Sequence, residues 1–207
     1  MKRLAIFISG RGSNLEAILD QVAGGVLAGR CVVTLVFTDN PAAPGLAIAR
    51  RRQVTTVAID ARSMRRFDFD AVLAELLERV RPDLIALAGY MRIVPPELVR
   101  RYRIVNIHPA DTARHRGLHG YRWAFEQRLP TTTITVHWVD EGLDTGPVIA
   151  RRVVNLAGAD SEAEVERRGL AVEHHLYPII LAQLLTDADS VDARGADARA
   201  HDRRGGN

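Results

Sequence analysis

Residues 103–108 read Arg103-Ile104-Val105-Asn106-Ile107-His108, the pattern of a buried parallel strand whose carboxyl end carries polar side chains. Side chains two residues apart on a strand point the same way, so Asn106 and His108 share one face. Ligands bind at the carboxyl end of the strands in open α/β sheets. An amide and an imidazole at that end can together hold a developing oxyanion, which packing alone would not require.

A carboxylate that could serve this ring is Asp144, in the segment Gly142-Leu143-Asp144-Thr145-Gly146-Pro147. A carboxylate close to His108 would orient the imidazole and raise its pKa, which would keep the ring protonated near neutral pH. The alternative is that the strand end is polar without a chemical role and that Asp144 only closes a turn.

Apolar runs of strand length alternate with segments of helical periodicity along most of the chain. The expected strands are 4–8, 32–37, 55–59, 84–88, 103–108, 132–139 and 148–154. The expected helices are 15–22, 44–52, 67–80, 95–101, 121–128 and a long one from 161 to about 185, interrupted by Pro178. This alternation predicts an α/β protein with three α/β/α layers and a mostly parallel, Rossmann-like sheet.

The length of 207 residues and the 47% apolar content suit one domain, which we expect over residues 1–185. Residues 186–207 are rich in Asp, Arg, Ala and Gly and poor in large apolar side chains. Such a segment cannot bury enough surface to offset the entropy of ordering it, so we predict a disordered tail.

Composition excludes several classes of chemistry. Lys2 is the only lysine, so a Schiff-base or Walker lysine is not available, and Cys31 is the only cysteine, which excludes an intrachain disulfide and a cysteine metal cluster. The net charge of +3 comes from scattered arginines without interleaved aromatics, so we expect no nucleic-acid partner. No apolar run reaches membrane-spanning length, and the expected location is the cytoplasm.

A glycine turn, Ser9-Gly10-Arg11-Gly12-Ser13-Asn14, connects the first strand to the first helix. Exposed backbone N–H groups and the helix dipole favour an anion there, and we favour a small phosphate group over a tight turn without a ligand. A dinucleotide fingerprint would need glycine or alanine where Leu15 stands, which argues against a nicotinamide-dependent dehydrogenase.

Several motifs occur in a fixed order along the chain. They are Ile8-Ser9-Gly10-Arg11-Gly12-Ser13-Asn14, Leu87-Ala88-Gly89-Tyr90-Met91-Arg92-Ile93, Asn106-Ile107-His108-Pro109, Asp140-Glu141-Gly142-Leu143-Asp144-Thr145-Gly146-Pro147 and Glu173-His174-His175-Leu176-Tyr177-Pro178. From about residue 2 to 185 the sequence thereby resembles the phosphoribosylglycinamide formyltransferases, a family of folate-dependent enzymes of purine synthesis. The resemblance implies the formyltransferase fold and transfer of a formyl group from 10-formyltetrahydrofolate to the amine of glycinamide ribonucleotide.

The resemblance also implies a role for individual residues. It implies a catalytic set of Asn106, His108 and Asp144, a substrate-phosphate loop of Gly12, Ser13 and Asn14, and Glu173 as the residue that holds the ribose hydroxyls. The implied folate-binding residues are Met91, Arg92, Ile93, Asn106, Asp140, Glu141, Gly142 and Asp144. His119 and His137 stand where the family also has histidine and could support the catalytic set. No metal is implied, the folate is consumed as a co-substrate, and the protein is expected to be a monomer or a homodimer with small-molecule substrates.

The sequence departs from the family beside the proposed catalytic strand. The family usually continues with Ser-Leu-Leu-Pro and later Pro-Gly-Leu-His, whereas this chain has Ala110-Asp111-Thr112-Ala113-Arg114-His115-Arg116-Gly117-Leu118-His119. The formyl-transfer groups are untouched, but the acceptor is left open. Arg114 and Arg116 could contact a different anionic acceptor, although we favour a place on the loop surface. A formyltransferase for another amine, a formyltetrahydrofolate hydrolase and a folate-binding protein without turnover are the alternatives.

Overall fold

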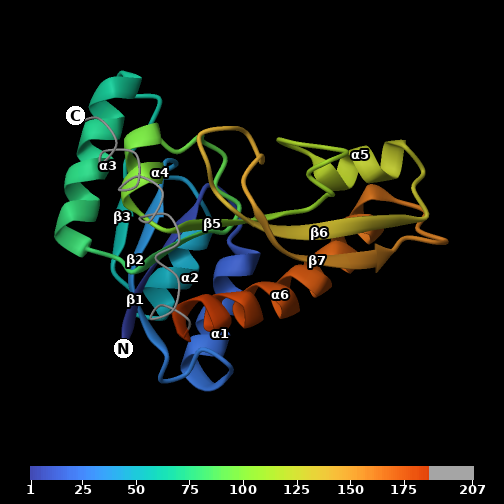
Figure 1. Cartoon of the computed structure of the whole chain (residues 1–207), viewed down its shortest axis with the longest axis horizontal. Coiled ribbons are helices and arrows are strands. Elements are labelled where there is room, and N and C mark those ends of the chain that lie inside the picture. The colour runs from blue at the N-terminus through green and yellow to red at the C-terminus, as the bar shows by residue number, and fades with distance from the viewer. Residues whose placement is uncertain (187–207) are drawn as a thin grey trace, which may run out of the picture.

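The sheet of the computed structural model, which describes residues 1–186, has seven strands in the order β3-β2-β1-β4-β5-β6-β7 (Figure 1). The strands are β1 (Lys2–Ile8), β2 (Cys31–Thr38), β3 (Thr56–Ala58), β4 (Leu84–Leu87), β5 (Ile104–His108), β6 (Thr131–Trp138) and β7 (Val148–Asn155). β1 to β5 pair in parallel, and β6 and β7 are antiparallel. The predicted mostly parallel sheet is therefore confirmed.

Helices cover both faces of the sheet, as predicted. They are α1 (Ser13–Gly24), α2 (Gly45–Arg51), α3 (Arg66–Val80), α4 (Pro96–Arg101), α5 (Gly120–Glu126) and α6 (Glu162–Thr186). Alternate residues of β1 face different layers, because Leu4 and Ile6 pack with α1, α2, α5 and α6, whereas Ala5 and Phe7 pack with α3 and α4. In Figure 1, α3 and α4 lie together on one side while α6 runs along the other. No helix within residues 1–186 has the length and apolar character to cross a membrane.

The order of the strands creates a gap for a ligand at one edge of the sheet. The chain winds outward from β1 through β2 to β3 and then returns to β4 on the other side of β1. The connections that leave β1 and β4 therefore diverge above their carboxyl ends, which is where open α/β sheets bind ligands. Asn106 and His108 lie at the same edge, at the end of β5.

The predicted interruption of the last helix at Pro178 is wrong. α6 is one helix from Glu162 to Thr186, with Pro178 inside it. Proline removes one N–H from the helix ladder and crowds the carbonyl four residues earlier, which favours a break. Here Tyr177, Pro178, Ile180 and Leu181 are all buried against the sheet, and this packing holds the helix together through the proline. The predicted tail, residues 186–207, lies outside the described residues except for Thr186, which ends α6.

Tyr177 fastens α6 to the strands that carry the site. Its side chain is fully buried, and its hydroxyl lies 3.0 Å from the carbonyl oxygen of Leu87 and 3.0 Å from that of Val105. One hydroxyl hydrogen is thus shared between a carbonyl of β4 and a carbonyl of β5. We expect Tyr177→Phe to lower the free energy of unfolding by about 1–2 kcal/mol, because two buried carbonyls lose their donor. Urea unfolding measures this loss.

A matched control for Tyr177 is Tyr102, a half-buried tyrosine at the end of α4 whose ring contacts Arg101. Tyr102→Phe should leave the midpoint of urea unfolding close to that of the wild type. Equal midpoints for Tyr177→Phe and Tyr102→Phe would show that the shared hydrogen bond does not stabilise the fold.

Candidate active site

A cleft of about 480 Å³ opens at the carboxyl edge of the sheet. Its walls are the β1–α1 turn, the segment after β4, the end of β5, the residues before α5, the loop after β6 and one side of α6. This volume lies in the range of small-molecule sites. The cleft collects every residue that the sequence proposed for a site except Glu141, which pairs with Arg100 of α4 instead.

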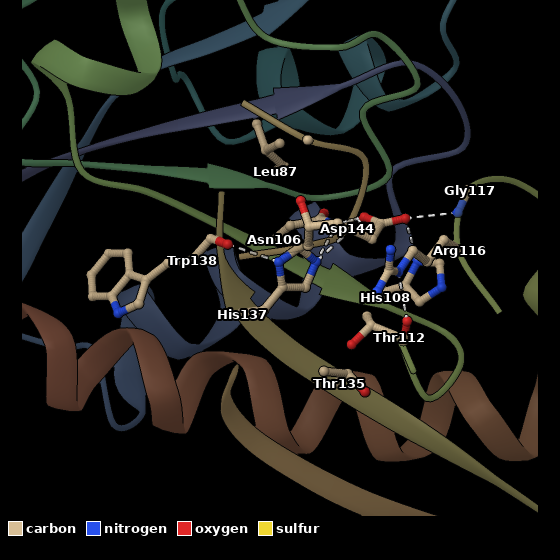
Figure 2. Close-up of polar contacts among 12 residues, drawn as sticks. Leu87, Asn106, His108, Thr112, Arg116, Gly117, Thr135, His137, Trp138 and Asp144 are labelled. Atoms are coloured by element: carbon tan, nitrogen blue, oxygen red, sulfur yellow. Dashed lines mark hydrogen bonds and ion pairs between the residues drawn. The ribbon is translucent and has the colours of Figure 1, made fainter. Parts of the chain in front are cut away.

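Asp144 is the centre of the polar cluster in this cleft. Its Oδ2 atom lies 3.4 Å from Nδ1 of His108 and accepts a hydrogen bond of 2.7 Å from the backbone N–H of Gly117. Its Oδ1 atom lies 3.4 Å from Nε2 of His137 and 3.3 Å from Nδ2 of Asn106. Figure 2 shows the carboxylate between the two imidazole rings. The three residues predicted as a catalytic set therefore meet around one carboxylate.

The loop after β6 presents Asp144 in an unusual backbone conformation. The φ of Asp144 is 51°, in the left-handed region that few residues other than glycine adopt. Thr145 donates to the carboxylate of Asp140 at 2.7 Å and closes the loop. At Gly146 a Cβ atom would lie 1.8 Å from the carbonyl oxygen of Trp138, so only glycine fits. This close approach aims the Asp144 side chain into the cluster.

Asp144 stays ionised at neutral pH. Partial burial by itself would raise its pKa, but the contact with His137, the N–H of Gly117 and the charge of His108 outweigh burial and lower the pKa to about 2. The cluster is therefore built around a permanent negative charge, which can orient a neighbouring imidazole and stabilise its protonated form.

The predicted rise in the pKa of His108 is wrong. The ring is 3% exposed, and burial lowers its pKa below the usual value, although Asp144 and the carbonyl of His115 act in the opposite direction. Nε2 lies 3.0 Å from the carbonyl oxygen of His115, and Nδ1 faces Asp144. Both ring nitrogens thus face acceptors, and a neutral ring can donate to only one of them. The sequence could not show how completely the loop after β5 covers this ring.

An NMR titration of the histidine rings tests this balance. We expect the pKa of His108 to lie below that of an ordinary histidine. Asp144→Asn should lower it further, because the carboxylate is the group that favours the charged ring. A His108 pKa at or above about 6.5, or no change in Asp144→Asn, would contradict this account.

The two histidines proposed to support the catalytic set have different positions. His137 is 2% exposed and pairs with Asn106 across β5 and β6. Its Nδ1 lies 2.8 Å from the carbonyl of Trp138 and must donate there, and its Nε2 lies 3.3 Å from Nδ2 of Asn106. His119 is exposed at the residue before α5, where it lines the cleft. The structure therefore brings His137, and not His119, into the cluster.

Glu173 forms a second polar cluster on the α6 side of the cleft. It is 4% exposed, and its two carboxylate oxygens accept from different donors, the hydroxyl of Tyr121 and the side-chain amide of Asn14. Burial raises the pKa of Glu173, while these two donors favour its charged form. From the sequence, Tyr121 is predicted only as the start of a helix. Its helical position gave no signal for this contact with a residue 52 positions away.

The β1–α1 turn has the tight geometry expected of it. Gly12 has a φ of 82°, and a Cβ atom there would lie 2.8 Å from the Cα of Gly45, so glycine is required. Ser13 begins α1, and its neighbour Asn14 is buried and turned towards Glu173. The turn thus offers backbone N–H groups to the cleft, while the Asn14 side chain belongs to the second cluster.

The segment after β4 gives the cleft an apolar rim. Met91 and Ile93 are 59% and 52% exposed, and the guanidinium of Arg92 lies 4.5 Å from the ring centre of Phe69. Leu143 is also exposed and lines the cleft from the loop after β6. Exposed apolar side chains beside polar groups suit a flat aromatic ligand that is buried on binding.

The unusual loop after β5 contacts the cluster directly. The His115 ring stacks on Trp123, with centroids 4.8 Å apart and planes 13° apart, and its carbonyl faces His108. Arg116 donates to the carbonyl of Thr112 at 2.8 Å, and the guanidinium of Arg114 lies 5.7 Å from the Trp123 ring. Both arginines make contacts within this region of the protein, which agrees with the favoured interpretation that they belong to the loop.

Comparison with known proteins gives consistent matches. The profile of the formyl transferase family matches residues 2–181. Phosphoribosylglycinamide formyltransferase of Bacillus subtilis is 35% identical over 188 residues, which cover 89% of this chain and 95% of that protein. Trifunctional purine biosynthetic protein adenosine-3 of Drosophila melanogaster is 36% identical over 187 residues, and the match covers 89% of this chain but only 14% of that protein. The crystal structure of phosphoribosylglycinamide formyltransferase from Bacillus halodurans has a TM-score of 0.85 at 37% identity, with 92% of this chain and 98% of that chain covered.

Proposed function

This chain belongs to the formyl transferase family, and on that premise we propose that it transfers a formyl group from 10-formyltetrahydrofolate to the amine of glycinamide ribonucleotide. The match to the family bears out the resemblance seen in the sequence. The family itself implies a folate co-substrate, and the identity of the acceptor is the part that we propose from the relatives' activity.

One observation carries the proposal: Asn106, His108 and Asp144 meet in a cleft that also contains a candidate folate surface and a candidate ribose site. The formyl group has to lie where the two substrates meet. The apolar rim after β4 provides one side of the cleft, and Glu173 on α6 provides the other. The polar cluster lies at the end of β5, in the same cleft as both surfaces.

The reaction requires donors at the formyl oxygen and a route for one proton. The acceptor's amine nitrogen bonds to the formyl carbon, the bond from that carbon to the folate nitrogen breaks, and a proton passes from the amine to the folate nitrogen. Negative charge grows on the formyl oxygen during attack. Asn106 Nδ2 and the His108 ring are the N–H groups that can stabilise this charge, and His108 can also carry the proton.

These donors also contact acceptors of the protein itself. Asn106 Nδ2 lies 3.3 Å from both Asp144 Oδ1 and His137 Nε2, and His108 Nε2 lies 3.0 Å from the carbonyl of His115. A formyl oxygen that gains negative charge attracts an N–H more strongly than a peptide carbonyl does. The contacts can therefore exchange as the charge develops. Asp144, which is ionised, stabilises His108 when the ring takes up a proton.

The remaining residues position the two substrates. Met91 and Ile93 would pack against the folate ring, next to the backbone of Asp140 and Gly142, which also line the cleft. Backbone N–H groups of the turn at Gly12 and Ser13 would receive the phosphate of the acceptor. Glu173 would accept from its ribose hydroxyls.

The purified chain tests the proposal with 10-formyltetrahydrofolate and glycinamide ribonucleotide, followed by the absorbance of the deformylated folate. We expect folate release that depends on the acceptor and matches the formyl product. Release of formate without an acceptor would show hydrolysis. If the formyl group is transferred only to another amine, the altered loop at 110–116 serves a different acceptor. A change in nicotinamide fluorescence on titration would support the dehydrogenase alternative, which the family match disfavours.

A further inference from the structure

We propose that Tyr121 is a positioning residue that fixes Glu173 for recognition of the acceptor's ribose hydroxyls and so helps to set acceptor specificity. This inference rests on the proposed function. It concerns a residue of α5 that lies outside the catalytic cluster and contacts Glu173 of α6 across the cleft wall.

The two donors to Glu173 orient its carboxylate completely. Tyr121 donates to Oε1 and Asn14 donates to Oε2, so each oxygen is held from a different element of the fold. A carboxylate oxygen can accept more than one hydrogen bond, so each oxygen keeps capacity for a ligand. With both donors in place, the carboxylate cannot rotate freely, and its remaining lone pairs have fixed directions.

The fold reserves space for the Tyr121 ring at this position. Gly169 of α6 is buried below the ring, and a Cβ atom there would lie 2.1 Å from Cε1 of Tyr121 and 2.5 Å from its hydroxyl oxygen. Any side chain at residue 169 would therefore displace the tyrosine. Tyr121 packs partly against the core cluster of α1 and α6, which limits its movement. The hydroxyl is thus placed against Glu173 by packing as well as by its hydrogen bond.

The cluster presents acceptors, and this fixes the chemistry of the ligand it can hold. Asn14 is 7% exposed, and its Oδ1 atom is buried without a hydrogen-bond partner among the described residues. Together with the two oxygens of Glu173, it gives three acceptor atoms on residues that line the cleft. A phosphate would be repelled by the carboxylate, whereas neighbouring hydroxyl groups supply the donors that these oxygens need.

The charge of Glu173 depends on the same contact. Burial favours the neutral acid, and the hydroxyl of Tyr121 and the amide of Asn14 favour the carboxylate. A neutral Glu173 would donate one hydrogen instead of accepting on both oxygens, and would fit two hydroxyl donors less well. Tyr121 therefore acts on the acceptor through Glu173, both by orienting the side chain and by favouring its charged form.

Tyr121→Phe tests this role because it removes only the hydroxyl and keeps the ring above Gly169. With glycinamide ribonucleotide as acceptor, we expect the KM for the acceptor to rise about tenfold or more, because this is the size of effect that follows from losing a hydrogen bond to a charged group. The value of kcat should change by less than about threefold. The KM for the formyl folate should stay the same. Tyr102→Phe, at the far end of α4, is the matched control and should change neither constant.

A second acceptor that lacks one ribose hydroxyl separates positioning from a general loss of stability. Wild-type protein should bind this acceptor more weakly than the full acceptor, and the difference should shrink in Tyr121→Phe, because the hydroxyl and Tyr121 act through the same carboxylate. Isothermal titration of both acceptors provides the same comparison without turnover. Gly169→Ala, which displaces the ring by steric contact, should repeat the pattern.

These measurements test the proposed function and the role of Tyr121 separately. A wild-type protein that neither binds nor formylates glycinamide ribonucleotide would overturn the proposed function. An active wild type with an unchanged acceptor KM in Tyr121→Phe, or with the same penalty for the missing hydroxyl in both proteins, would overturn the role of Tyr121 alone. If Tyr121→Phe fails to fold by circular dichroism, Gly169→Ala decides the question by the same measurements.

Discussion

His108→Ala is expected to lower kcat/KM for formyl transfer by about 100- to 1000-fold, the effect of losing one donor at a developing oxyanion or one positioned proton carrier. The ring is buried at the end of β5, between the carboxylate of Asp144 and the carbonyl of His115. No other histidine of residues 1–186 has the same two contacts, so the variant leaves nothing to replace it. Steady-state kinetics with both substrates measures the loss, which should fall mainly on kcat.

His175 provides a matched histidine on the exposed side of α6. His175→Ala should retain wild-type kinetics, and both variants should give the far-ultraviolet circular dichroism of the wild type. If a folded His108→Ala keeps more than about a tenth of the wild-type kcat/KM, the ring takes no part in the transfer and the proposed mechanism is wrong.

Asp144→Asn is the second change with a large expected effect, a fall in kcat/KM of at least about 100-fold. In the serine-protease triad, the equivalent loss of a buried carboxylate beside the histidine lowers kcat by about 10⁴. Asparagine keeps the shape of the side chain and tolerates the left-handed backbone at this position. The fall in activity therefore measures the effect of the negative charge alone. Without that charge, the protonated form of the buried His108 ring is no longer stabilised.

The pH dependence of stability gives this variant an independent readout. The pKa of Asp144 is about 2 in the folded protein and about 4 in an unfolded chain, so its stabilising contribution is present above pH 4. That contribution is lost as the pH falls from about 4 to about 2, and Asp144→Asn should remove this part of the acid destabilisation. Asp160→Asn, at an exposed position before α6, is the matched control for both kinetics and stability. Wild-type activity in Asp144→Asn would exclude a role for the carboxylate.

Most of the fold could be predicted because the sequence pattern and the packing agree. Each predicted strand and helix overlaps an observed one, and the central strands β1, β4 and β5 are largely buried on both faces and read as apolar runs. Asn106 and His108 could be placed together for the same reason, because the two-residue period of a strand does not depend on the rest of the fold. Asp144 lies in a loop, where no such period applies, so its place in the catalytic set could be predicted only with the help of the family resemblance.

The contacts that were missed depend on distances that a single sequence does not contain. Tyr121 reaches Glu173 because α5 crosses near α6 where Gly169 leaves space, and a helical pattern gives no sign of this crossing. The pKa of His108 falls because a surrounding shell of side chains excludes water, and only the assembled cleft shows how much burial outweighs Asp144. The predicted interruption at Pro178 relied on the local tendency of proline to break a helix, and the burial of α6 against the sheet outweighs that tendency.

The register between β5 and β6 has a consequence for how such an enzyme can diverge. Asn106 stands opposite His137 and His108 stands opposite Thr135, so the sheet ladder itself sets the spacing of these groups. A slip of one residue would turn them all to the other face, and selection can hardly tolerate it. The connection from 109 to 130 adds contacts but carries none of this spacing. A lineage can therefore exchange that connection for one suited to another amine and keep the spacing of Asn106, His108 and His137.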